Sequence, residues 1–217
     1  MNHGQPNPFI TIENIQRSIS EWSNKSSLLT KSQQGVINQE PRPGWQPPNP
    51  QPPPPPPFVK VNVDGAWDEE SHHSGVGIII RNHRGHSIAG ASIHGSHNSA
   101  IEVEAEAVVK GLQLAAHMNL QKIIVEGDCN EVLTALNNSS CHPNWRISPS
   151  IDKISHLKTL FVGINWNWIP REANRVADVA AKLAKLRLRS HKWANRPPTS
   201  IVSILRSDDG LPGPPCS

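Results

Sequence analysis

The sequence predicts an α/β domain built on a mixed five-stranded sheet with helices on both faces, preceded by a proline-rich leader. Three observations predict this fold class. Residues 59–64 alternate between apolar and polar side chains, as in a strand with one buried face. Residues 102–119 carry apolar side chains at helical spacing. Of the 21 prolines, 11 lie between Pro41 and Pro57, so the leader cannot form a core and the rest of the chain must.

The elements follow in an order that fixes the type of sheet. After the strand at 59–64 we expect strands at 75–81 and 86–93, antiparallel because their connections are short. The remaining elements are expected as a helix at 102–119, a strand at 122–125, a helix from Asn130, a helix at 151–160, a strand at 163–169 and a helix at 174–188. A strand, helix, strand step requires a crossover and therefore a parallel pair, which makes the sheet mixed.

Composition divides the chain into three parts. Residues 1–57 form a leader, with a short helix expected at 11–22 and a polyproline II segment at 41–57. That segment is either a stiff spacer or a ligand for an SH3-like or WW-like domain. Residues 58–188 form the α/β domain. Residues 189–217 are expected to be a basic, proline-containing, disordered tail. All charged residues from Lys182 to Arg206 are basic, and this charge is either a footprint for phosphates or a solvated helix face that runs into the tail.

Several classes of protein are excluded by simple counts. No run approaches the roughly 18 apolar residues that a membrane span needs, so we expect no membrane partner. The N-terminus lacks the basic and apolar regions of a secretory signal, which favours an intracellular protein, nuclear or cytoplasmic. The cysteines are odd in number and form no CxxC pair, which argues against disulfides and structural zinc.

Four acidic residues stand at the edges of apolar segments. Asp64 ends the first strand, Asp128 follows the run at 123–125, and Asp178 lies in the first turn of the last helix. Glu104 lies seven residues before Gly111, on a face that a glycine lets approach the sheet. Each alone is typical of a cap or a turn, but four together need a counter-charge, which a hard divalent cation supplies. Carboxylates that hold two such ions are typical of phosphodiester hydrolysis.

The segments 61–66, 102–112, 125–128 and 169–178, in this order, resemble the type 1 ribonuclease H domain. More narrowly, they resemble the plant ribonuclease H-like domains related to retrotransposon reverse transcriptases. The resemblance implies a ribonuclease H-like fold and two-metal cleavage of the RNA strand of RNA–DNA hybrids with Mg²⁺, or with Mn²⁺. It also implies that the catalytic and metal-binding residues are Asp64, Glu104, Asp128 and Asp178.

Two departures from the family pattern keep a second function open. Where many members carry Thr-Asn-Asn, this chain has residues 99–101 as Ser-Ala-Ile, with the nearest amide at Asn98. Trp168 takes the place of a loop histidine. Trp166 and Trp168 either stack on bases or, as we expect, are buried or half-buried on their strand. The alternative is therefore a domesticated nucleic-acid-binding module with little or no turnover. We expect a monomer whose nucleic-acid contacts come from Asn98, Arg171, Asn174 and Lys182.

Overall fold

The structure is a computed structural model that describes residues 53–138, 143–194 and 196–208 of the 217-residue chain. The helix expected at 11–22 and residues 41–52 of the proline-rich segment lie outside these residues, as do Cys141 and Cys216.

A mixed sheet of six strands organises the described part of the chain. Its order is β5-β4-β1-β2-β3-β6, in which β1 pairs in parallel with β4 and β4 with β5, while the other neighbours are antiparallel. The strands are β1 (Val59–Trp67), β2 (His73–Arg81), β3 (Ser87–Ser96), β4 (Lys122–Gly127), β5 (Gly163–Trp168) and β6 (His191–Ala194). The mixed α/β class predicted from the sequence is confirmed.

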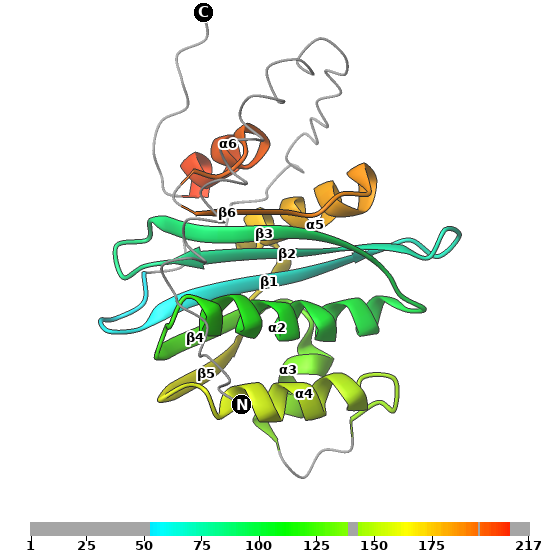
Figure 1. Ribbon diagram of the computed structural model, residues 1–217, viewed down its shortest axis with the longest axis horizontal. Helices are drawn as coiled ribbons and strands as arrows, with labels where there is room; N and C mark the ends of the chain where they lie inside the picture. The colour runs from blue at the N-terminus through cyan, green and yellow to red at the C-terminus, as the bar shows by residue number, and fades with distance from the viewer. Residues whose placement is uncertain (1–52, 139–142, 195, 209–217) are drawn as a thin grey trace, which may run out of the picture. The chain divides into compact units, whose positions relative to one another are not determined.

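Helices cover both faces of the sheet (Figure 1). One face carries α2 (Ala100–His117), α3 (Asn130–Asn137) and α4 (Ser148–Lys158), and the other carries α5 (Arg175–Arg187) and α6 (Thr199–Asp208). A short 3-10 helix, η1 (Arg171–Ala173), leads into α5. Among the described residues, no helix has the length and apolar character to cross a bilayer.

The alternation along β1 divides its side chains between the two faces. Val61 and Val63 are buried in the core beneath α2. Gly111 lets that helix approach closely, because a Cβ there would lie 2.7 Å from Cγ1 of Val63. The expectation that Gly111 turns its helix face toward the sheet is thus confirmed, and the same face carries Glu104.

The sixth strand is the main correction to the predicted fold. We expected five strands and a disordered tail from residue 189, but β6 pairs with β3 and α6 packs nearby. Trp193, Ile201 and Leu205 are buried in one cluster with Ile79 and residues of α5. The prediction of disorder is therefore wrong over 191–194 and 199–208, because these side chains cover a sheet face that would otherwise be exposed. Residues 209–217 lie outside the described part.

Candidate active site

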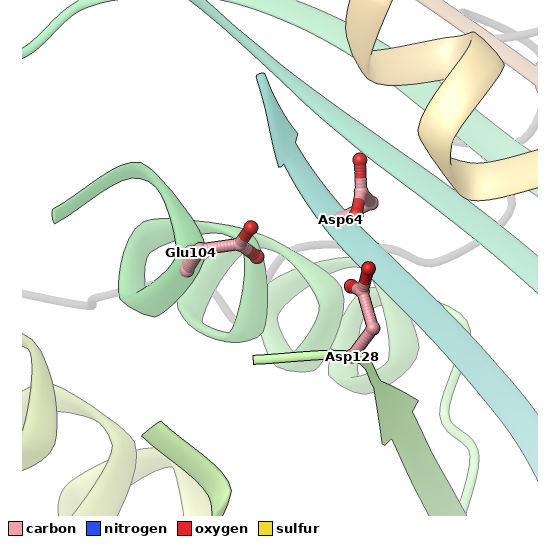
Figure 2. Close-up of side chains that lie close together, drawn as sticks. All are labelled: Asp64, Glu104 and Asp128. Atoms are coloured by element: carbon pink, nitrogen blue, oxygen red, sulfur yellow. The ribbon is translucent and has the colours of Figure 1, made fainter. Parts of the chain in front are cut away.

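Three of the four predicted acids meet toward the carboxyl ends of the inner strands β1 and β4. Asp64 lies near the end of β1, Glu104 in α2, and Asp128 directly after β4. One carboxylate oxygen from each residue lies within 4.8 Å of the other two. Figure 2 shows the three side chains gathered between the ends of the two strands and the start of the helix. We call these residues the acid triad.

Strand register and one glycine bring the acid triad together. Asn62 pairs with Glu126 in the parallel β1–β4 ladder, so Asp64 and Asp128, two residues further on, lie at the same level. Gly65 leaves room for α2, since a Cβ there would lie 2.9 Å from the backbone nitrogen of Glu104. The backbone N–H of Gly65 also donates a hydrogen bond to the Glu104 carboxylate. The helix therefore delivers Glu104 directly to the strand end.

Two carboxyl groups of the acid triad have strongly raised pKa values. Burial, reinforced by the charges of Glu104 and Asp128, raises the pKa of Asp64 to about 10. Burial and the charge of Asp128 raise the pKa of Glu104 to about 8, although the Gly65 N–H and the Arg171 charge oppose the shift. Asp64 is only 1% exposed, and its Oδ2 has no hydrogen-bond partner among the described residues. At neutral pH and without a cation, protons reduce the repulsion within the triad.

Asp178 adjoins the acid triad but is not part of the group whose oxygens converge. Its Oδ1 accepts a hydrogen bond from Nη2 of Arg171 at 3.0 Å, and its Oδ2 accepts one from Nζ of Lys182 at 2.7 Å. Its charge still contributes to the raised pKa values of Asp64 and Glu104. We expected four acids to converge, whereas the structure brings three together and pairs the fourth with two cations.

The predicted nucleic-acid contacts separate into accessible and buried residues. The side chains of Arg171 and Lys182 are 66% and 51% exposed, and Asn98 is exposed just before α2. Asn174 is 2% exposed, and its Nδ2 donates to the backbone oxygen of Val63 at 2.9 Å and to Oδ1 of Asp128 at 3.4 Å. The prediction that Asn174 contacts nucleic acid is wrong for this conformation, because the side chain faces inward and supports Asp128.

Trp168 lies at the exposed limit of its predicted environment. We expect core or half-buried packing, and the residue is 53% exposed at the end of β5, where its Nε1 donates to the backbone oxygen of Asp128 at 3.0 Å. Trp166 is partly buried against the α2-side core, as expected. Alternation places both residues on one face of the strand, so the pattern could not reveal that the core ends between them.

Sequence reasoning also missed a buried ion pair on the same strands as the acid triad. Nζ of Lys60 lies 2.9 Å from Oε1 of Glu126, and Nδ2 of Asn62 donates to Oε2 at 3.0 Å. All three residues are buried. Lys60 and Asn62 read as the solvent-facing half of an alternating strand, and only their position in a sheet covered on both faces would have indicated burial.

The acid triad has the composition of a site for a hard divalent cation. Such ions prefer carboxylate oxygens, and the triad offers three that already converge. The buried Oδ2 of Asp64, which lacks a hydrogen-bond partner among the described residues, fits this interpretation. A buried carboxylate without a counter-charge is costly, and a bound cation would remove that cost. The donor set therefore fits Mg²⁺ or Mn²⁺ better than softer metals.

Comparison with known proteins places this geometry in a family. Residues 62–184, more than half of the chain, match the family model described as reverse transcriptase-like. No match was found among curated proteins.

Solved structures of ribonucleases H share the fold. RNase H1 from Halobacterium salinarum is 22% identical, with a TM-score of 0.56 over 61% of this chain and 99% of its own. The N-terminal RNase H domain of rv2228c from Mycobacterium tuberculosis is 20% identical, with a TM-score of 0.56 over 60% and 94%. LC11-RNase H1, isolated from compost and solved in complex with an RNA/DNA hybrid, is 19% identical, with a TM-score of 0.55 over 60% and 98%. The chain therefore belongs to the reverse transcriptase-like family and has a domain of the type 1 ribonuclease H-like fold.

Proposed function

We propose that this protein is a metal-dependent endoribonuclease that cleaves the RNA strand of RNA–DNA hybrids. One observation carries the proposal: the carboxylates of Asp64, Glu104 and Asp128 converge, and within the described residues none of the three forms an ion pair with a lysine or arginine. The fold supports it, because a neighbour of the same fold was solved in complex with an RNA/DNA hybrid. Raised pKa values in a group of carboxylates are typical of functional sites.

The residues of the acid triad would hold the cation, with Mg²⁺ as the proposed physiological ion and Mn²⁺ as its substitute. When bound, the ion would supply positive charge against the charge that develops on the phosphate and would make water a better nucleophile. Asp64 and Glu104 would release their protons on binding, because only the ionised carboxylates act as ligands.

The other residues around the acid triad would position the ligands and the substrate. Asn174 holds the Asp128 carboxylate through Nδ2, which limits the rotation of that side chain. Arg171 and Lys182 hold Asp178 away from the triad and reduce its repulsion. We propose Asp178 as the fourth ligand, because its charge already acts on Asp64 and Glu104, and it would then have to leave at least one of these cations.

The decisive experiment is cleavage of an end-labelled RNA–DNA hybrid in Mg²⁺. Wild-type protein should cut the RNA strand, D128N should not, and a chelator should stop the reaction. The matched control is E131Q, because Glu131 lies three residues further on but is exposed and outside the triad. The proposal would be contradicted if D128N cut the hybrid as fast as wild type does, or if cleavage by wild type continued in the presence of a chelator.

A second candidate function is a nucleic-acid-binding module without turnover. The pairing of Asp178 with both Arg171 and Lys182 favours it, because this carboxylate is occupied by protein cations. The same experiment separates the two functions. If wild type and D128N bind the hybrid equally and neither cuts it, the binding module is correct.

A further inference from the structure

The segment that joins β5 to α5 presents two exposed side chains beside the acid triad. Trp168 ends the strand, and Arg171 begins η1 three residues later. Both are more than half exposed. Between and after them, Ile169 and Asn174 are buried and hold the segment against the sheet. The segment is therefore firmly attached and directs an aromatic ring and a guanidinium outward.

Each exposed group is fixed by a hydrogen bond to a residue in or beside the acid triad. The indole Nε1 of Trp168 donates to the backbone oxygen of Asp128 at 3.0 Å. The Nη2 of Arg171 donates to Oδ1 of Asp178 at 3.0 Å. The backbone N–H of Ile169 donates to the Gly127 oxygen at 2.9 Å, which ties the segment to β4 as well. The ring and the guanidinium are thus held in place before any ligand arrives, which lowers the entropy cost of binding.

The charges around Arg171 indicate that its guanidinium interacts with the acids of the triad and still has free N–H donors that can bind an anion. Its pKa is raised, first by the hydrogen bond with Asp178 and also by the charges of Asp64 and Asp128. A guanidinium offers five N–H donors, and the bond to Asp178 uses one of them. A phosphate that approached the triad would meet this positive group at the solvent side, because the side chain is 66% exposed.

We propose that Trp168 and Arg171 form a clamp for one nucleotide of the strand bound at the acid triad. The guanidinium binds a phosphate, and the indole packs on the adjoining sugar or base. Both contacts are typical of proteins that bind nucleic acid strands. The clamp rests on the proposed function, since it names residues of this chain that would hold the substrate of the same site.

Sugar and base packing differ in the substrate they require. A base within a duplex has both faces covered by its neighbours, so an indole can reach it only where the base is unpaired. A sugar is accessible at the edge of a paired duplex. If the clamp packs on a sugar, its contribution is the same on paired and mismatched hybrids. If it packs on a base, its contribution is greater on a hybrid with a mismatch at the bound position.

The test measures hybrid binding in a D64N background, so that cleavage does not interfere and no activity is needed as a readout. W168A should weaken binding about 5- to 150-fold, the loss expected for one stacking contact. W168F should restore binding to within about threefold, because it keeps an aromatic face without the indole N–H. Neither variant should change the dependence of affinity on salt.

Arg171 has a different signature. R171A should weaken binding and also lower the slope of log affinity against log salt by about 0.7–0.9, the value for one lost phosphate contact. The control is R84A, which removes an exposed charge from the turn between β2 and β3. This turn lies at the end of the sheet away from the acid triad, so R84A should have a smaller effect on the affinity and on its salt dependence.

The outcomes separate the clamp from the proposed nuclease activity. Unchanged affinity in both W168A and W168F, on paired and on mismatched hybrids, would overturn the clamp even if wild type cleaves hybrids. A loss in W168A that W168F restores would support the clamp even if wild type cleaves nothing. Thermal unfolding of each variant identifies a misfolded protein, and the milder W168F remains informative if W168A does not fold.

Discussion

Two groups of charged side chains lie along β1 and β4: in one a carboxylate forms an ion pair with a lysine, and in the other three carboxylates converge. Toward the start of β1, Glu126 is held by Lys60 and Asn62 at 2.9 and 3.0 Å. Two residues further along both strands, Asp64 and Asp128 meet Glu104 instead of a lysine. Glu126 and Asp64 are both buried on these paired strands, but Glu126 meets a lysine and an amide whereas Asp64 meets two further acids.

The two groups indicate two different roles for a carboxylate at this sheet. A buried carboxylate with a lysine and an amide contributes to a defined structure, because both of its oxygens have partners. A triad of acids costs folding free energy in the absence of a cation, because burial and repulsion raise the pKa values to about 10 for Asp64 and about 8 for Glu104. We infer that the first group supports the fold and that the second serves a ligand.

The largest effect should be the loss of cleavage in D64N. Removing one ligand of the proposed cation should lower the rate of hybrid cleavage by about 10³-fold, since charge stabilisation by a metal contributes several kcal/mol to the barrier. K60M should keep cleavage within about tenfold, once the rate is corrected for the folded fraction, because Lys60 holds no ligand. Initial rates on a labelled hybrid decide the matter, and equal losses in the two variants would remove the distinction between the groups.

The next effect concerns the stability of the balanced pair. K60M should lower the free energy of unfolding by about 3–5 kcal/mol, because it leaves Glu126 buried and charged without a partner. K60M combined with E126L should recover at least half of that loss, since neither charge then remains. Urea unfolding at pH 7 measures both values. A neutral effect of K60M would show that Glu126 does not depend on its lysine.

Removing an acid of the triad should stabilise the protein, whereas removing Lys60 should destabilise it. D64N should raise the free energy of unfolding of the metal-free protein at pH 8 by about 1–3 kcal/mol, because it removes a carboxylate buried among acids. The pKa of Asp64 is 3.8 in the unfolded chain and about 10 in the folded protein. Between these two values the folded state binds more protons than the unfolded state. Wild-type stability therefore falls as pH rises, and the advantage of D64N should grow from pH 6 to pH 9. A less stable D64N at pH 8 would contradict this account.

Cation binding should become stronger as pH rises, because it displaces protons from the same carboxyl groups. In Ca²⁺, which occupies oxygen sites, the thermal stabilisation of wild type should increase from pH 6 to pH 9. The pKa values of about 10 and about 8 mean that binding displaces protons from Asp64 and Glu104. Affinity should rise by up to about tenfold per pH unit for each proton displaced. Thermal scans of wild type and D64N measure the shift, and D64N should show a much smaller one.

The smallest effect should come from the exposed partner of Asp178. K182Q should change the free energy of unfolding by less than about 1 kcal/mol, because the Lys182 side chain is 51% exposed and solvent screens the pair. Chemical unfolding of K182Q beside K60M therefore compares a surface ion pair with a buried one. A loss as large as that of K60M would indicate that Lys182 balances the acid triad itself.

Much of the α/β domain could be predicted because its patterns are local. The alternation along β1 and the apolar stripe of α2 each require one buried face, and both are present. Asp64 and Asp128 could be placed together because they end neighbouring apolar runs. Glu104 was found by its spacing to Gly111, which reports how closely the helix approaches the sheet.

The missed features depend on what covers a surface, which a local pattern does not show. β6 has four residues with one buried indole, too short for a periodic signal. α6 did carry a signal in the helical spacing of Ile201 and Leu205, but the basic residues around it suggested a solvated tail. Asn174 was predicted to contact nucleic acid, but it is buried and donates to Asp128, since a polar side chain gives no indication of which face it occupies.

The strand and helix added after α5 change where the domain can be cut. The match to the family ends at residue 184, yet Trp193 and Ile201 seal the surface formed by Ile79 and Val176. A protein truncated at residue 184 would expose an apolar surface and the unpaired edge of β3. Both features promote aggregation. A protein prepared for experiments should therefore retain the chain through residue 208, and poor solubility of a shorter version would be a result of the truncation rather than a property of the full chain.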